Sequence, residues 1–112
     1  MAEKDSNVNS KTLSKALRTL KSRFATSDIK SMKEVPGEYI TGIRSALGLG
    51  YNTLINRYHD PRKLTLEDIL NTADITSTDY EIVLNVAIRE ALRNHTKRDI
   101  SKLLPTDGET TD

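Results

Sequence analysis

A glycine turn between two helical segments constrains the fold more than any other stretch of the chain. Apolar side chains at helical spacing run up to Gly48, which stands where a helix C′ glycine belongs. Glycine is favoured there because it alone avoids the Cβ penalty of the left-handed region. A second helix starts near Gly50 and ends before Pro61, since the residue before proline avoids the α region. The sequence therefore predicts a helix-turn-helix over residues 40–58.

The second helix of this pair has one apolar and one polar side. On a helical wheel, Leu54, Ile55 and Tyr58 fall on one side together with Tyr51. The other side has no carboxylate and carries two amides, a hydroxyl and a guanidinium, from Asn52, Asn56, Thr53 and Arg57. An acid-free polar side suits contact with a polyanion, although a solvated helix surface would have the same composition.

Further helical segments flank the pair on both sides. Before it, residues 11–25 follow a helical apolar repeat with Ser10 as the expected cap, and residues 29–35 form a short helix or turn that Pro36 and Gly37 end. After it, Thr65 or Leu64 starts a helix, and Thr65 with Asp68 resembles a capping box. Ser77 or Thr78 caps the last long helix, about 79–94, and residues 99–104 form one more turn or a continuation of that helix.

These segments predict an all-α, compact domain of five or six helices, with no period-two pattern typical of strands. One domain is expected from 112 residues. We expect the helical domain to span residues 10–104, after a disordered lead at 1–9 and before a flexible acidic tail at 105–112.

The last long helix has apolar side chains on more than one side. Opposite the apolar side expected to face the core lies a second apolar set, which consists of Leu84, Ile88, Ala91 and Leu92. A surface helix of a small domain needs only one apolar stripe, so this second set predicts a dimer interface. The alternative is a central helix that its own chain buries on all sides.

Charge is distributed unevenly along a chain whose formal net charge is only +1. Residues 1–63 hold twelve Lys and Arg against six Asp and Glu, whereas residues 64–112 hold five against ten. Such a split is typical of a polyanion-binding surface, or it reflects ordinary scatter of surface charge. If the first explanation holds, the cations should gather around the start of the second helix of the pair.

Several classes of protein are not expected. The chain has no Cys, no apolar leader and no apolar run near the length of a membrane span, so we expect a cytoplasmic protein that does not enter membranes. His59 and His95 are far apart in the sequence and no metal-site spacing surrounds them. Phosphate-loop and serine-nucleophile motifs are also missing. We therefore expect no enzyme, no catalytic residues, no metal and no cofactor.

Residues 43–75 resemble the helix-turn-helix core of lambda-repressor-like (Cro/repressor type) DNA-binding proteins. The matching features are the turn at Leu47-Gly48-Leu49-Gly50, the buried positions Ile43 and Leu54, and a following leucine-rich helix that ends in Ala73. The resemblance implies that the second helix enters the major groove of double-stranded DNA.

The resemblance also implies which residues contact DNA. The set consists of Gly50, Tyr51, Asn52, Thr53, Asn56, Arg57, Arg62 and Lys63. The two asparagines suit adenine, Arg57 suits guanine or a phosphate, and the last two cations suit the backbone. Tyr51 either donates to a phosphate or packs on the apolar side.

Three functions agree with these features. The first is a sequence-specific, dimeric transcription regulator of the repressor type, from a bacterium, a phage or a mobile element. The second is a helical protein-interaction module, such as a phage structural or packaging-associated protein. The third is the antitoxin of a toxin–antitoxin pair, which would bind DNA and also use its C-terminal half on a protein partner.

Overall fold

The computed structural model describes residues 8–105, and its regular structure is entirely helical over that range. The helices are α2 (Ser10–Ala25), α3 (Glu34–Glu38), α4 (Ile40–Leu47), α5 (Tyr51–Tyr58), α6 (Leu66–Ile75) and α7 (Tyr80–Arg93), with short 3₁₀ turns η1 (Pro61–Lys63) and η2 (Ser101–Leu103). The predicted all-α class is confirmed, with six α-helices in the described part of the chain. Most of the predicted lead and acidic tail lie outside the described residues.

Every α-helix contributes to one buried core. Leu20, Ile43, Leu54 and Val83 are fully buried, and they come from four different helices. Fully burying a side chain of this size is worth about 1.5–3 kcal/mol. Because α4 and α5 supply core residues at successive turns, the turn between them is held in place on both sides.

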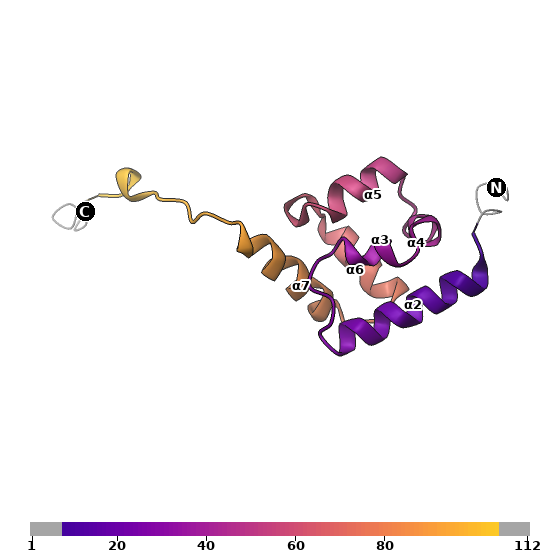
Figure 1. Ribbon diagram of the computed structural model, residues 1–112. Coiled ribbons are helices and arrows are strands. Elements are labelled where there is room, and N and C mark those ends of the chain that lie inside the picture. Colours follow the sequence, from indigo (N-terminus) through magenta and orange to yellow (C-terminus); the bar gives the residue numbers. More distant parts are fainter. Residues whose placement is uncertain (1–7, 106–112) are drawn as a thin grey trace.

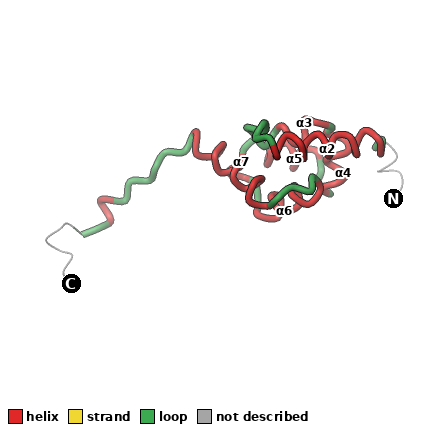
Figure 2. Tube along the Cα trace, turned by 90° about the horizontal axis from the view of Figure 1, so that it is seen from below, coloured by secondary structure: helices red, strands yellow, loops and turns green. Residues whose placement is uncertain are grey.

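The helices surround this core so that the outer surfaces of α5 and α2 lie apart. In Figure 1, α5 and α2 lie on opposite sides of the body, with α3 between them. The chain leaves the body at the end of α7 as an extended arm, residues 94–105, which both views show pointing away from the helices (Figures 1 and 2). None of the described helices is both long enough and apolar enough to cross a membrane.

The predicted capping box is confirmed, whereas two other caps differ from expectation. Thr65 accepts from the Asp68 N–H, and the Asp68 carboxylate accepts from the Thr65 N–H. Asn9, not Ser10, caps α2 through the N–H of Thr12. For both α2 and α7 the sequence predicted a hydroxyl side chain as the cap. In each case the neighbouring Asn or Asp caps the helix instead.

The cap of α7 is Asp79 rather than Ser77 or Thr78, and it accepts from the Glu81 N–H at 2.8 Å. The two residues expected to start α7 instead finish α6. Ser77 has a left-handed backbone with φ 50°, and the N–H of Thr78 donates back to the Ala73 carbonyl. This pattern is the usual closure of a helix C-terminus.

Of the segment expected to form a short helix or turn over residues 29–35, residues 29–33 form a loop with a turn at Met32 and Lys33, and the last two residues begin α3. The N–H groups of Lys30 and Ser31 donate to the Glu34 carboxylate, and that of Met32 donates to Glu90 of α7 at 2.8 Å. These acceptors replace the carbonyls that a helix would use. Pro36 lies in the first turn of α3, where no helical hydrogen bond needs its missing N–H, so it does not end the helix as predicted.

Gly42 lies where α4 crosses the start of α2. A Cβ there would come within 2.6 Å of two ring carbons of Tyr39 and 3.0 Å of a methyl group of Leu13. The Tyr39 ring cannot shift easily because its hydroxyl accepts from the Asn9 N–H at 2.9 Å. We expect Gly42→Ala to lower the free energy of unfolding by about 1–3 kcal/mol, the range typical of overpacking, measured by urea denaturation.

Gly37→Ala is the matched control for this prediction. A Cβ at Gly37 meets no atom within 4 Å among the described residues, so the substitution should leave stability unchanged or raise it slightly. Equal stability of the two variants would contradict a tight crossing at Gly42.

Candidate nucleic-acid interface

The turn between α4 and α5 has the geometry that the sequence predicts. Gly48 closes α4 with φ 70° and ψ 30°, in the left-handed region. The N–H of Gly48 donates to Ser45 O, and that of Leu49 donates to Arg44 O at 3.2 Å. Two carbonyls of the last turn of α4 are therefore satisfied within a three-residue turn, and α5 begins immediately after Gly50.

The left-handed backbone conformation of Gly48 makes other residues at this position destabilising. Alanine in the left-handed region costs about 1–2 kcal/mol, while asparagine tolerates it better. No described atom lies within 4 Å of a Cβ built there, so crowding does not complicate the comparison. We expect thermal unfolding to rank the variants wild type, Gly48→Asn, Gly48→Ala in falling stability. An alanine variant as stable as the wild type would contradict this account.

The inner side of α5 is fixed to α6 through Tyr58. This side chain is fully buried, and its hydroxyl lies 2.7 Å from the Thr72 hydroxyl and 3.4 Å from the Asp68 carbonyl oxygen. Burial raises the pKa of the phenol to about 12. The neutral hydrogen-bonded phenol holds the end of α5 against the middle of α6.

An ion pair makes a second connection between α5 and α6. Nη1 of Arg57 lies 3.0 Å from one carboxylate oxygen of Asp68 and 3.3 Å from the other. The Asp68 side chain is 5% exposed and that of Arg57 is 35% exposed. Arg57 was predicted as a DNA contact; in the structure its guanidinium points toward α6 and positions α5.

The outer side of α5 exposes the predicted amides. Asn52 and Asn56 are exposed, Thr53 is half-buried, and the helix contains no acidic residue. Tyr51 is 56% exposed at the helix start, so it does not pack into the core with Leu54. Asn52 and Asn56 thus form a solvent-facing ridge on α5, and Tyr51 is exposed at the start of the same helix.

The N-terminus of α5 has no side-chain cap. Gly50 occupies the N-cap position, with φ −71° and ψ 161°, and contributes no side-chain hydrogen bond. Residues with a side chain adopt this conformation readily, and the described residues leave open space for a Cβ there. A Ser or Asp would cap the helix better in the free protein. Glycine instead leaves the first N–H groups accessible to an anion.

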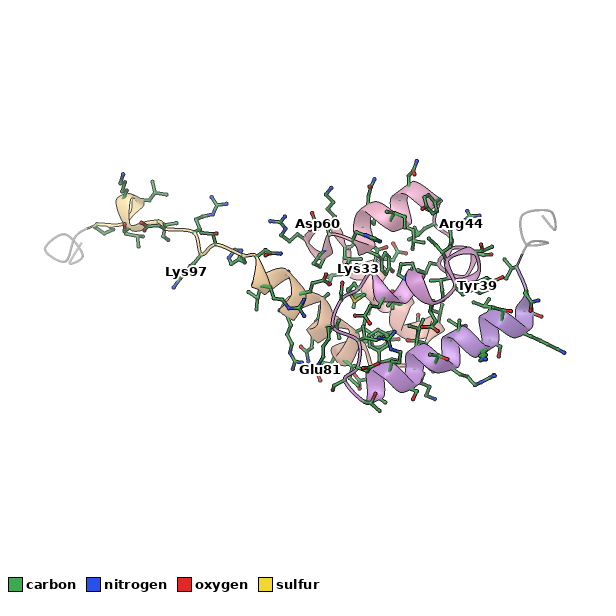
Figure 3. All side chains as sticks on the ribbon, viewed as in Figure 1. Lys33, Tyr39, Arg44, Asp60, Glu81 and Lys97 are labelled. Carbon is green, nitrogen blue, oxygen red and sulfur yellow. The ribbon has the colours of Figure 1, made fainter. Side chains whose placement is uncertain are left out.

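Charged side chains lie at both ends of α5: Figure 3 shows Arg44 near its start and Asp60 beyond its end. Arg62 and Lys63 are exposed in η1, which directly follows Asp60. Nε of Arg62 pairs with Asp60 at 3.3 Å, and the hydrogen bond from this side chain lowers the pKa of Asp60. Arg62 is therefore partly neutralised.

The basic half of the chain does not gather around α5 as a whole. Four of the five cations of α2 are exposed, namely Lys11, Lys15, Arg18 and Lys21, and this helix packs against α3, α4 and α7. Figure 1 places α2 on the side of the body away from α5. The expected clustering is therefore wrong for α2, because sequence position says nothing about which side of the fold a helix occupies.

Two positioning residues escaped the sequence analysis. Asp68 was recognised only as half of a capping box, and Thr72 was not singled out, yet both hold α5. The capping box was the only local signal for Asp68. Among the described residues, no group of three or more His, Cys, Asp or Glu side chains could hold a metal ion.

Comparisons with protein-family models, with curated proteins and with solved structures find no match for this chain. A function assigned to the chain is therefore drawn from the geometry of its own residues. That geometry is an exposed, acid-free ridge on α5 that is held in place by the buried Tyr58–Thr72 contact and the half-buried Arg57–Asp68 pair.

Proposed function

We propose that the protein binds double-stranded DNA sequence-specifically, with α5 in the major groove, as a dimeric transcription regulator of the repressor type. The observation that carries the proposal is the outer side of α5, where Asn52 and Asn56 are exposed one turn apart beside an uncapped helix start. A major groove admits one helix, and asparagine pairs bidentately with adenine.

The residues around the ridge take different parts in this proposal. Asn52 and Asn56 read base edges, Thr53 contacts a thymine methyl group or a phosphate, and the Gly50 backbone and Tyr51 hydroxyl bind a phosphate. Arg62 and Lys63 add backbone contacts that depend on salt but not on sequence. Arg57 acts mainly through Asp68, by fixing the angle at which α5 leaves the body.

The proposed dimer uses the apolar side of α7 predicted from the sequence. Ile88 is 45% exposed and Leu92 59%, while Leu84 and Ala91 are half-buried. The described part of the same chain thus covers the second apolar stripe only in part, and Ile88 and Leu92 are its exposed members. Two copies joined there would present two α5 ridges to two half-sites, which multiplies affinity and specificity.

Selection from random-sequence DNA at two salt concentrations tests the proposal. We expect one enriched motif and weaker binding at higher salt. Asn52→Ala and Asn56→Ala should each reduce discrimination by about 10- to 100-fold, the effect of losing one good base contact. Lys63→Ala should weaken specific and random DNA equally and lower the salt slope by about one.

Asn85→Ala is the matched control, because it removes an exposed amide from α7 rather than from α5. It should leave the motif and the affinity unchanged. If no motif is enriched and binding does not respond to salt, DNA recognition by α5 is excluded.

One observation favours a second candidate function, a protein-interaction module. Leu66, Leu70, Ile88 and Leu92 are all exposed large apolar side chains on α6 and α7. An antitoxin would use the same C-terminal half on a toxin. A stable complex with an unrelated small protein that covers this surface, in a chain that selects no DNA, would favour the interaction module; DNA selection together with such a complex would favour the antitoxin.

A further inference from the structure

Helix α2 has a basic side that the proposed DNA contact of α5 does not use. Five of its sixteen residues are Lys or Arg, and none is Asp or Glu. On a helical wheel, four of these cations share one side with two hydroxyls, opposite the buried Ala16, Leu20 and Phe24. This basic side of α2 consists of Lys11, Ser14, Lys15, Arg18, Lys21 and Ser22, all of them exposed.

The cations of the basic side form no ion pair with any carboxylate of residues 8–105. Nη1 of Arg18 donates to the neutral Ser14 hydroxyl at 2.8 Å. The fifth cation of α2, Arg23, is half-buried and pairs with three acids, Asp28, Glu34 and Glu38. Arg23 therefore helps to hold the fold, whereas the other four cations leave their positive charge on the surface.

This arrangement opposes helix stability in the free protein. The four cations follow one another at spacings of four, three and three residues, and like charges at these spacings repel each other on a helix surface. Lys11 lies in the first turn, where the helix dipole favours an acid and none is present. A polyanion bound along the basic side would relieve this repulsion.

The chemistry of the basic side fits a phosphate backbone better than a membrane or another protein. Lys, Arg and Ser side chains are groups that contact phosphate oxygens in DNA complexes. A membrane-surface helix inserts its apolar side among lipids, but the apolar side of α2 is buried in the core through Leu20 and Phe24. Protein interfaces depend on large apolar and aromatic side chains, which the basic side lacks.

The position of α2 separates its basic side from the ridge on α5. Helix α2 packs against α3, α4 and α7, and Figure 1 places it across the body from α5. A duplex bound at α5 and a duplex bound at α2 would therefore lie on different sides of the same molecule.

We propose that the basic side of α2 binds the phosphate backbone of a second DNA segment without sequence preference, so that one protein holds two segments together. The choice of DNA among polyanions rests on the proposed function. Binding of a phosphate backbone at α2 does not require that α5 recognises bases, so the two can be tested separately.

Binding of a random-sequence DNA duplex by the full-length chain tests α2 by itself. Asn52→Ala/Asn56→Ala is the background, so that base recognition by α5 does not contribute. Adding Lys11→Gln/Lys15→Gln/Arg18→Gln should weaken binding by roughly tenfold or more and lower the salt slope by about three, close to one for each lost phosphate contact. This triple variant removes like-charge pairs, so its unfolding midpoint should not fall.

Lys33→Gln/Lys97→Gln/Lys102→Gln is the matched control, because it removes the same charge from exposed positions outside α2. It should lower the salt slope by less than about one. Equal losses in the two triple variants would mean that only net charge matters, which overturns the proposal. A background protein that does not bind the random duplex even at low salt also overturns it.

Capture of a second duplex tests whether two segments are held together. The wild-type protein is bound to an immobilised duplex that contains the motif selected by α5, and a fluorescent duplex without the motif is added. We expect capture of the fluorescent duplex, and the α2 triple variant should lose it while it still binds the immobilised duplex. Equal capture by the wild type and this variant overturns the bridge.

Vesicles of phosphatidylserine and phosphatidylcholine supply the remaining comparison. If the α2 triple variant loses binding to these vesicles but binds DNA as the wild type does, the partner of α2 is a membrane and the proposal is wrong. If no motif is selected from random DNA, the proposed function of α5 fails, while the random duplex still decides whether α2 binds a phosphate backbone.

Discussion

Replacing Asp68 by Ala is expected to lower the free energy of unfolding by about 2–3 kcal/mol at neutral pH, the combined scale of losing a helix cap and one partner of a largely buried ion pair. The Asp68 carboxylate accepts from both Arg57 and the backbone N–H of Thr65. Its loss leaves the N–H without an acceptor and the guanidinium without its counter-charge. The expected cost lies below that of a fully buried pair because Arg57 is partly exposed. Urea denaturation gives the measurement.

Glu67→Ala is the matched control, because Glu67 is an exposed acid at the preceding position of the same first turn. It should change stability by less than about 0.5 kcal/mol, the usual effect of a surface substitution. Asp68→Asn should fall between the two, since an amide oxygen can still accept from Thr65. Similar losses in Glu67→Ala and Asp68→Ala would mean that only helix-end charge matters.

The same substitution also tests how α5 is held for DNA binding. If Arg57 acts through Asp68, Asp68→Ala should weaken specific DNA binding under conditions in which the protein is still fully folded. If Arg57→Ala weakens specific DNA binding and Asp68→Ala does not, Arg57 would instead contact DNA directly.

Alkaline pH is expected to destabilise the fold through Tyr58. Burial raises the pKa of its phenol from 10.0 to about 12. Between these values the folded chain holds the proton more tightly than the unfolded chain, so the free energy of unfolding falls as pH rises. The contribution of Tyr58 is complete below about pH 10, and roughly 2–3 kcal/mol is lost by pH 12, which follows from 1.36 kcal/mol for each pKa unit.

Denaturation of Tyr58→Phe at pH 8 and at pH 11.5 checks this expectation. The variant should be less stable at pH 8 by about 1–2 kcal/mol, because the buried Thr72 hydroxyl loses its partner. It should also lose less stability than the wild type between the two pH values.

Tyr80→Phe serves as the control for general alkaline effects. A hydrogen bond to Asp74 raises the pKa of Tyr80, but this side chain is exposed and does not touch the core. Its removal should change the pH dependence far less than Tyr58→Phe does. If the two variants behave alike, the buried phenol is not the source of the alkaline loss.

Features that depend on a few neighbouring residues could be predicted from the sequence. The left-handed glycine at Gly48, the start of α5 after Gly50 and the capping box at Thr65 are all as expected. Each of these depends on hydrogen bonds and steric contacts within about four residues along the chain, so the local sequence contains the necessary information.

Other features depend on residues that are distant in the sequence. Residues 29–33 form a loop in which side chains accept backbone N–H groups, and one of these acceptors, Glu90, lies 58 residues beyond its partner Met32. The close packing around Gly42 arises where α2 crosses α4.

The site divides in the same way. The sequence by itself determined an acid-free amphipathic helix after a glycine turn, because helical periodicity assigns Asn52 and Asn56 to one side. Only the tertiary structure decided that Arg57 turns toward Asp68 and that α2 with its cations lies on the side of the body away from α5. Ion pairs and surface patches depend on how helices pack, and packing brings together residues whose separation along the chain carries no local signal.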